Sequence, residues 1–220
     1  MKKVLIIAAA LLMSASAFTG EAWNNHVGFG WRLPSPSTMH TEKKDWENLK
    51  MWQSGIDLQY TGVLMSNGFT VHAMIDYAIS NSNYDTRPGA ELSSLWGFNT
   101  DLLVGAGWAP IRTKELFFGF YGMLGYDITV LGYDSESFDS DKTIYKDYVG
   151  YMAFLPAVNA TFVWTPAKTF SLYATASVGY NCPTVIYREL ESGGHDKEKF
   201  KSLSRGGVKV IPAVGISWKF

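Results

Sequence analysis

Residues 116–130 read LFFGFYGMLGYDITV, and large apolar side chains alternate with small or polar ones along this stretch. Successive side chains of a strand point to opposite faces of a sheet, so the alternation predicts a strand with one apolar and one polar face. A helix would spread the same apolar residues around its axis, and glycine and aromatic residues disfavour it. One face carries Phe118, Phe120, Leu124, Tyr126, Ile128 and Val130, and the other carries Gly119, Tyr121, Gly125, Asp127 and Thr129.

The same two-residue period recurs in seven other segments of the chain. A tilted strand crosses a bilayer in about 9–11 residues, which these segments supply. Segment 148–164 has the weakest pattern, because it is apolar on both faces and contains Pro156. Together the segments predict an all-β fold: an eight-stranded antiparallel up-and-down transmembrane β-barrel. The remaining six are residues 23–33, 51–60, 69–80, 95–108, 170–180 and 208–220.

The connections between these segments alternate in length. Short turns on the periplasmic side and long polar loops outside are typical of bacterial outer-membrane barrels. With eight strands, this pattern places both chain ends on the side of the short turns. The short connections are residues 65–68, 110–115 and 165–169, and the long ones are residues 34–50, 81–93, 133–147 and 181–207.

The beginning of the chain predicts export. Two lysines precede an apolar run at residues 4–13, and Ala-Ser-Ala at residues 15–17 fits a signal-peptidase site. The run is shorter than the roughly 20 residues that a membrane helix needs. We expect residues 1–17 to be a signal peptide, with a second cleavage position after Ala22, and residues 23–220 to form a single barrel domain. A retained anchor helix is the alternative.

Composition excludes several classes of protein. Cys182 is the only cysteine, so an internal disulfide framework is excluded. It also lies far from the signal region, where a lipoprotein would need a cysteine. The net charge is −1 without a basic stripe, which argues against a nucleic-acid partner. No Gly-x-Ser-x-Gly, His-Glu-x-x-His or phosphate-binding glycine loop occurs, so we expect neither an enzyme nor a cofactor.

Charged side chains occupy the polar face of the predicted strands, which we assign to the barrel interior. An eight-stranded barrel is just wide enough to be filled by its side chains, and enclosed charges must pair or be hydrated. We therefore expect an internal network that holds the barrel closed; a narrow polar path or ligand pocket is the alternative. The network would comprise His26, Arg32, Asp57, His72, Asp76, Asp101, Asp127 and Lys209.

Two of the long loops are rich in charge. Residues 133–147 contain several acidic side chains, but they lack the glycine and terminal glutamate of a calcium loop. We expect a hydrated loop there and no metal site. Residues 181–207 mix both signs and could meet host surfaces or lipopolysaccharide phosphates. The charges of the first loop are Asp134, Glu136, Asp139, Asp141 and Asp147 against Lys142 and Lys146.

Aromatic residues mark the ends of several predicted strands. Trp108 and Trp164 each precede a short proline-containing turn, and Trp218 and Phe220 end the chain. Tryptophan and tyrosine gather at the membrane–water interface of barrels, so we predict an aromatic girdle at these positions.

The alternation Val214, Ile216, Trp218, Phe220 at the end of the chain resembles the C-terminal signal read by the barrel-assembly machinery of diderm bacteria. Together with the export signal and the strand pattern, the mature chain resembles the small eight-stranded outer-membrane proteins, the OmpA-barrel, OmpX and OmpW class; its loops also resemble small treponeme barrels. The resemblance implies an outer-membrane location, surrounding lipids, and assembly through periplasmic chaperones and that machinery.

Three functions remain open from the sequence. The first is a barrel with a filled interior whose surface loops have structural or interaction roles. The second is a conduit for small molecules, hydrophobic ones included. The third is a soluble lipocalin-like binding barrel, because residues 28–31 (Gly-Phe-Gly-Trp) echo the Gly-x-Trp of that family. The acidic inward face disfavours the second, and the outward apolar face disfavours the third.

Overall fold

The computed structural model describes residues 23–41, 49–84, 93–136, 144–189, 199–200 and 204–220. The expected signal peptide and its second cleavage position lie outside these residues. No helix in the described part of the chain is long and apolar enough to cross a membrane. The strands are β1 Trp23–Thr41, β2 Leu49–Leu64, β3 Phe69–Tyr84, β4 Ser93–Arg112, β5 Leu116–Glu136, β6 Ile144–Phe154, β7 Ala157–Trp164, β8 Phe170–Glu189, β9 Lys199–Phe200 and β10 Ser204–Lys219.

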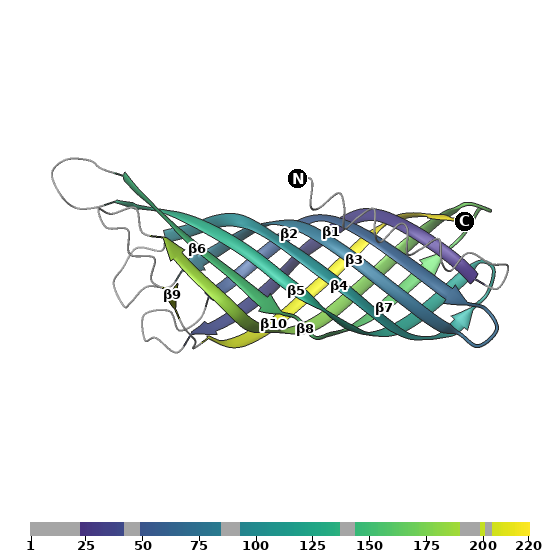
Figure 1. The fold of residues 1–220 in the computed structure, drawn as a ribbon. Helices are drawn as coiled ribbons and strands as arrows, with labels where there is room; N and C mark the ends of the chain where they lie inside the picture. Colours follow the sequence, from purple (N-terminus) through teal and green to yellow (C-terminus); the bar gives the residue numbers. More distant parts are fainter. Residues whose placement is uncertain (1–22, 42–48, 85–92, 137–143, 190–198, 201–203) are drawn as a thin grey trace.

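The strands form a closed antiparallel barrel (Figure 1). Sequential strands pair from β1 to β6, β8 pairs with both β6 and β7, and β10 joins β8 to β1. The closing pair runs from His26↔Lys219 to Thr41↔Ser204. The start of β1 and the end of β10 therefore lie at one end of the barrel, together with the short turns, as the sequence predicts.

Strands β6 and β7 are two parts of one barrel strand. On the β5 side the pairs Tyr126↔Phe154 and Met123↔Ala157 keep the same register across the break. Pro156 lies in the break and has no N–H to donate to the ladder. Its carbonyl still accepts a hydrogen bond of 3.1 Å from the Tyr180 amide. The weak segment 148–164 is thus a single interrupted strand, and the predicted eight-stranded barrel is confirmed.

The strands are longer than the sequence predicts. The expected loop 34–50 is largely strand, since β1 continues to Thr41 and β2 begins at Leu49. The expected loop 181–207 begins as the last part of β8, so Cys182 is a strand residue that pairs with Phe154 and not a loop residue. These extensions follow the backbone hydrogen bonds of the neighbouring strand, which do not require apolar alternation.

The acidic segment 133–147 also begins and ends as strand. Its arms pair as Tyr133↔Asp147 and Asp134↔Lys146, while residues 137–143 lie outside the described part of the chain. The prediction of one hydrated loop over the whole segment was therefore wrong for its two ends.

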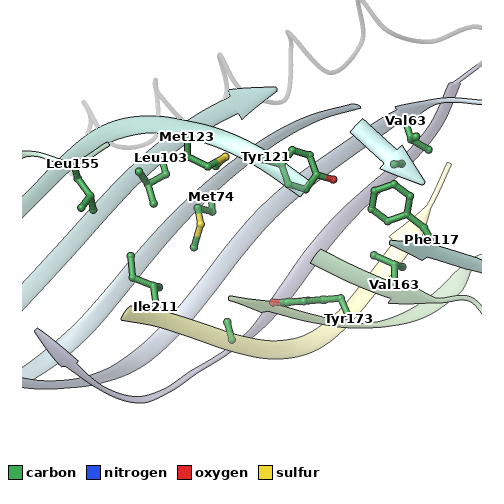
Figure 2. Close-up of a cluster of buried hydrophobic side chains, with 12 residues drawn as sticks. Val63, Met74, Leu103, Phe117, Tyr121, Met123, Leu155, Val163, Tyr173 and Ile211 are labelled. Carbon is green, nitrogen blue, oxygen red and sulfur yellow. The ribbon is translucent and has the colours of Figure 1, made fainter. Parts of the chain in front are cut away.

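The barrel is apolar outside and mixed inside. Outward tryptophans such as Trp31, Trp52 and Trp96 are more than half exposed. Figure 2 shows buried side chains such as Met74, Leu103 and Ile211 pointing into the space that the strands enclose. A soluble lipocalin would expose polar residues and enclose an apolar ligand site, so this distribution argues against that alternative.

We predict that Val104→Arg destabilises the barrel in lipid vesicles by about 2–4 kcal/mol, because a charge on the lipid face near the membrane centre is desolvated. Val104 lies near the middle of β4 and is 59% exposed. Urea unfolding followed by tryptophan fluorescence measures the effect. Thr113→Arg, in an exposed turn, serves as the matched control. Equal stability of the two variants would contradict a lipid-facing wall.

Candidate functional site: a charged belt inside the barrel

Four aspartates lie side by side across four neighbouring strands. The ladder pairs Asp57 with Asp76, Asp76 with Asp101, and Asp101 with Asp127, from β2 to β5. All four side chains are completely buried. Directly paired positions put their side chains on the same face of the sheet. The inward face therefore carries a row of four carboxyl groups, which we call the aspartate row.

Two basic side chains reach this row from the closing strands. Arg32 on β1 forms an ion pair of 2.6 Å between Nη1 and Asp101 Oδ2. Lys209 on β10 places Nζ 2.6 Å from Asp101 Oδ1 and 2.8 Å from Asp127 Oδ2. Each of these charges is wholly buried. Both oxygens of Asp101 are thus held by a cation.

Neutral polar side chains add hydrogen bonds to the ion pairs, although Arg32 Nε has no partner among the described residues. Arg32 Nη2 donates to Gln53 Oε1 at 2.7 Å, and Arg32 Nη1 donates to Asn99 Oδ1 at 2.7 Å. Asn99 Nδ2 donates onward to Asp127 Oδ1 at 2.7 Å. Buried ion pairs are tolerated only when such bonds satisfy their remaining donors and acceptors.

Two tyrosines connect strands β6 and β8 to the aspartate row by hydrogen bonds. Tyr151 on β6 donates its hydroxyl to Asp127 Oδ2 at 3.2 Å. Tyr173 on β8 donates its hydroxyl to Asp57 Oδ2. The ring of Tyr173 crosses the paired glycines Gly30 and Gly215, where an added Cβ would lie 2.2 Å and 2.7 Å from the tyrosine. Glycine at these positions leaves the space that the ring occupies.

Asp76 has a different environment from Asp101 and Asp127. Within the described part of the chain, neither of its carboxylate oxygens has a hydrogen-bond donor, and neither does Oδ1 of Asp57. No ion pair of Arg32 or Lys209 with either residue occurs there. We call the aspartate row, its two cations and their polar partners the belt. Its cations pair with Asp101 and Asp127, whereas Asp57 and Asp76 have no ion pair in the described part of the chain.

The two inward histidines lie outside this belt. His72 Nδ1 is 2.9 Å from Thr61 Oγ1, and its ring lies 4.8 Å from that of Tyr121. His26 Nδ1 is 3.5 Å from Ser171 Oγ. Both are buried closer to the short turns. Of the eight residues expected in an interior network, the structure buries all, joins Arg32, Asp101, Asp127 and Lys209 by ion pairs, and leaves the histidines separate.

Sequence reasoning missed the uncharged members of the belt. Gln53, Asn99 and Tyr173 stand on the polar face of their predicted strands, so alternation placed them inward. A neutral side chain carries no charge that must be paired, so the pattern does not predict which of these residues join the network. Tyr151 lies in the segment that is apolar on both faces, and nothing in its local pattern indicates a polar contact.

The expected girdle residues lie on the outside of the short-turn end. Trp108, Trp164, Trp218 and Phe220 are exposed. Trp108 Nε1 donates to the carbonyl of Asn67 in the neighbouring turn at 3.1 Å. An exposed ring with one hydrogen-bonded edge suits the boundary between lipid and water. Among the C-terminal alternating residues, Val214 is exposed and Ile216 is half-buried.

No group of three or more His, Cys, Asp or Glu side chains that could hold a metal occurs within the described ranges.

No family model matches the chain, and no curated protein matches it. Among solved structures it is similar to a major outer membrane protein from Thermus thermophilus, with 12% identity, a TM-score of 0.62, and coverage of 90% of this chain and 99% of that one. The fold is that of an outer-membrane β-barrel. The apolar exterior agrees with the predicted outer-membrane location and with contact to its lipids.

Two further solved barrels align over similar lengths. Ail of Yersinia pestis, its attachment invasion locus protein, has 14% identity and a TM-score of 0.46 over 90% of this chain and 99% of that one. The outer membrane protease OmpT of Escherichia coli has 8% identity and a TM-score of 0.47 over 92% and 98%. At these identities the likeness concerns the fold alone, and a fold does not decide between binding, transport and catalysis.

We predict that Lys209→Met destabilises the barrel by about 3–5 kcal/mol, because it leaves two buried aspartates without their cation. The urea midpoint of the folded protein in detergent measures the change. Lys168→Met, an exposed lysine in a short turn, is the matched control. A Lys209→Met barrel as stable as the control would show that the ion pairs do not hold the wall together.

Proposed function

We propose that this protein is a closed outer-membrane barrel that does not conduct, and that it works through its exposed ends and its structural presence in the membrane. The observation that carries the proposal is an ion pair that crosses the barrel interior. Strands β10 and β4 lie on opposite sides of the eight-stranded ring, yet Lys209 reaches Asp101. An ion pair that joins opposite walls and has no exposed surface leaves no open path at that level.

Other contacts cross the lumen at different levels. The hydroxyl of Tyr151 lies 3.9 Å from Met51 Sδ, and the hydroxyl of Ser177 lies 3.4 Å from Met74 Sδ. Each pair joins walls that face each other across the ring. Closer to the short turns, Phe117 and Val163 fill the interior with apolar side chains (Figure 2). Closure therefore does not depend on the ion pairs alone.

A channel or transporter for small molecules is the competing function. It would require a continuous hydrated or apolar path, and that path would have to separate Lys209 from Asp101. Breaking such a buried pair leaves uncompensated charges and costs several kcal/mol. The geometry favours the closed barrel over this alternative.

A closed interior directs function to the two ends of the barrel. Strand β8 extends to Glu189, within the mixed-charge segment 181–207, so we infer that this segment contacts the environment or a partner surface. This role needs no catalytic step and no cofactor. Recognition of the last strand by the assembly machinery, removal of residues 1–17, and chaperone escort belong to the same proposal.

We predict no single-channel conductance when the mature chain is inserted into planar bilayers. A heat-modifiable band on unboiled gels checks that the inserted barrel is folded. The double variant Arg32→Ala/Lys209→Ala removes both basic side chains from the lumen, and we expect no conducting steps from it either, because Phe117 and Val163 still fill the interior closer to the short turns. Reproducible steps from the wild-type protein would overturn the closed-barrel proposal.

We predict that Phe220→Ala lowers the amount of barrel inserted into the outer membrane, because it removes the terminal aromatic residue of the assembly signal. Phe170→Ala removes an outward aromatic residue near the same end and is the control. Fractionation with a folded-band assay measures insertion. Equal loss in both variants would assign the effect to the lipid interface and not to recognition of the last strand.

A further inference from the structure

Three lysines gather at one side of the short-turn end of the barrel. Lys114 lies in the turn between β4 and β5, Lys168 lies in the turn between β7 and β8, and Lys219 is the last residue of β10. Two backbone hydrogen bonds hold these segments side by side. One of 2.7 Å joins the second turn to the first, and one of 2.9 Å joins the second turn to Lys219. We call these three residues the lysine corner.

The lysine corner lacks acidic partners for its charges. None of its side chains forms an ion pair in the described part of the chain. Lys114 and Lys168 are exposed, whereas Lys219 is half-buried and places its Nζ 3.5 Å from the backbone carbonyl of Lys114. Glu115 is the one acidic residue in the short turns. The corner therefore keeps a net positive charge.

Charge is distributed unequally between the two ends of the barrel. The four long connections together contain more acidic than basic residues. The short turns and the last two residues contain four basic residues and one acidic residue, namely Arg112, Lys114, Lys168 and Lys219 against Glu115. A surface of one sign raises the local concentration of species of the opposite sign, so the short-turn end favours an anionic partner.

Exposed tryptophans place the lysine corner at the membrane boundary. Trp164 directly precedes the turn that contains Lys168, and Trp218 directly precedes Lys219. Both rings are about half exposed on the outer wall. Tryptophan settles at the level of the lipid headgroups, and a lysine next to it can hold its ammonium group in water at that level. The charges of the corner therefore stand where the phosphate groups of lipids lie.

We propose that the lysine corner binds the headgroup of an anionic phospholipid in the leaflet that surrounds the short turns. Lysine ammonium groups bind phosphate oxygens as point charges, and basic side chains beside a membrane attract anionic lipids. A zwitterionic headgroup offers the same phosphate but adds a positive charge that the corner repels. The proposal holds whether or not the lumen conducts.

A soluble acidic polymer, such as the peptide-bearing glycan of the cell wall, is the competing partner. Such a polymer would approach the corner from the aqueous side and would not need aromatic residues beside it. Lys168 and Lys219 instead follow closely after outward tryptophans that contact the membrane boundary. This arrangement favours the lipid.

The test compares how tightly the folded mature chain retains two lipids. Barrels in detergent micelles are titrated with phosphatidylglycerol or with phosphatidylcholine of the same acyl chains, and native mass spectrometry counts the bound molecules. We expect the wild type to bind phosphatidylglycerol more tightly. Lys114→Gln/Lys168→Gln should lower that affinity about 10- to 30-fold, since each lysine beside an anionic surface contributes roughly a factor of five. The affinity for phosphatidylcholine should not change.

Two further variants serve as matched controls, and a folded band on unboiled gels checks each barrel. Lys142→Gln/Lys146→Gln, in the acidic segment 133–147, should keep the wild-type preference. Glu115→Gln removes the acidic neighbour of Lys114 and should strengthen the binding of phosphatidylglycerol.

A wild-type barrel without a preference between the two lipids, or a Lys114→Gln/Lys168→Gln barrel that keeps the preference, would overturn the proposal. Wild-type barrels that show no lipid preference but sediment with isolated cell-wall sacculi, in a manner that the double lysine variant loses, would assign the corner to the acidic polymer.

Discussion

Every backbone N–H and C=O in the hydrocarbon layer needs a partner within the protein, because no water is available there. The pairing of β1 with β10 meets this requirement by removing the free edges of the sheet. Pro156 is tolerated in the wall for the same reason. It lacks a donor, but its carbonyl and the neighbouring Leu155 amide are both bonded, the latter to the carbonyl of Gly125 at 2.8 Å. Closure, and not the strength of any one strand, sustains the fold.

Closure also decides what the interior contains. The strand pleat directs alternate side chains inward, and eight strands enclose only enough space for those side chains. Charges on the inward face are therefore brought together across the lumen, however far apart they stand in the chain. Lys209 on the last strand meets Asp101 and Asp127 in this way. A narrow closed barrel converts a polar face into an internal network, and that network blocks the lumen.

The four aspartates of the row differ in the side chains that they contact. Asp101 and Asp127 are held by the cations and by the amide of Asn99. Asp57 and Asp76 occupy equivalent ladder positions without such partners. Asp57 instead accepts a hydrogen bond from the Tyr173 hydroxyl. The filled lumen and the unpaired acidic pair are thus two consequences of one geometry.

The two-residue alternation by itself determined the number of strands, the inward and outward faces and the shared end of the chain termini, because all three depend only on the local period and on the order of turns. Strand length, bond partners and the neutral members of the belt were decided by the tertiary structure. Nothing local in residues 34–41 or 181–189 predicts a strand, since their pairing depends on the neighbour's backbone. No local pattern predicts that Arg32 pairs with Asp101 and not with Asp57. The strand register and the closure of the barrel determine this pairing, and both arise only when distant strands pair.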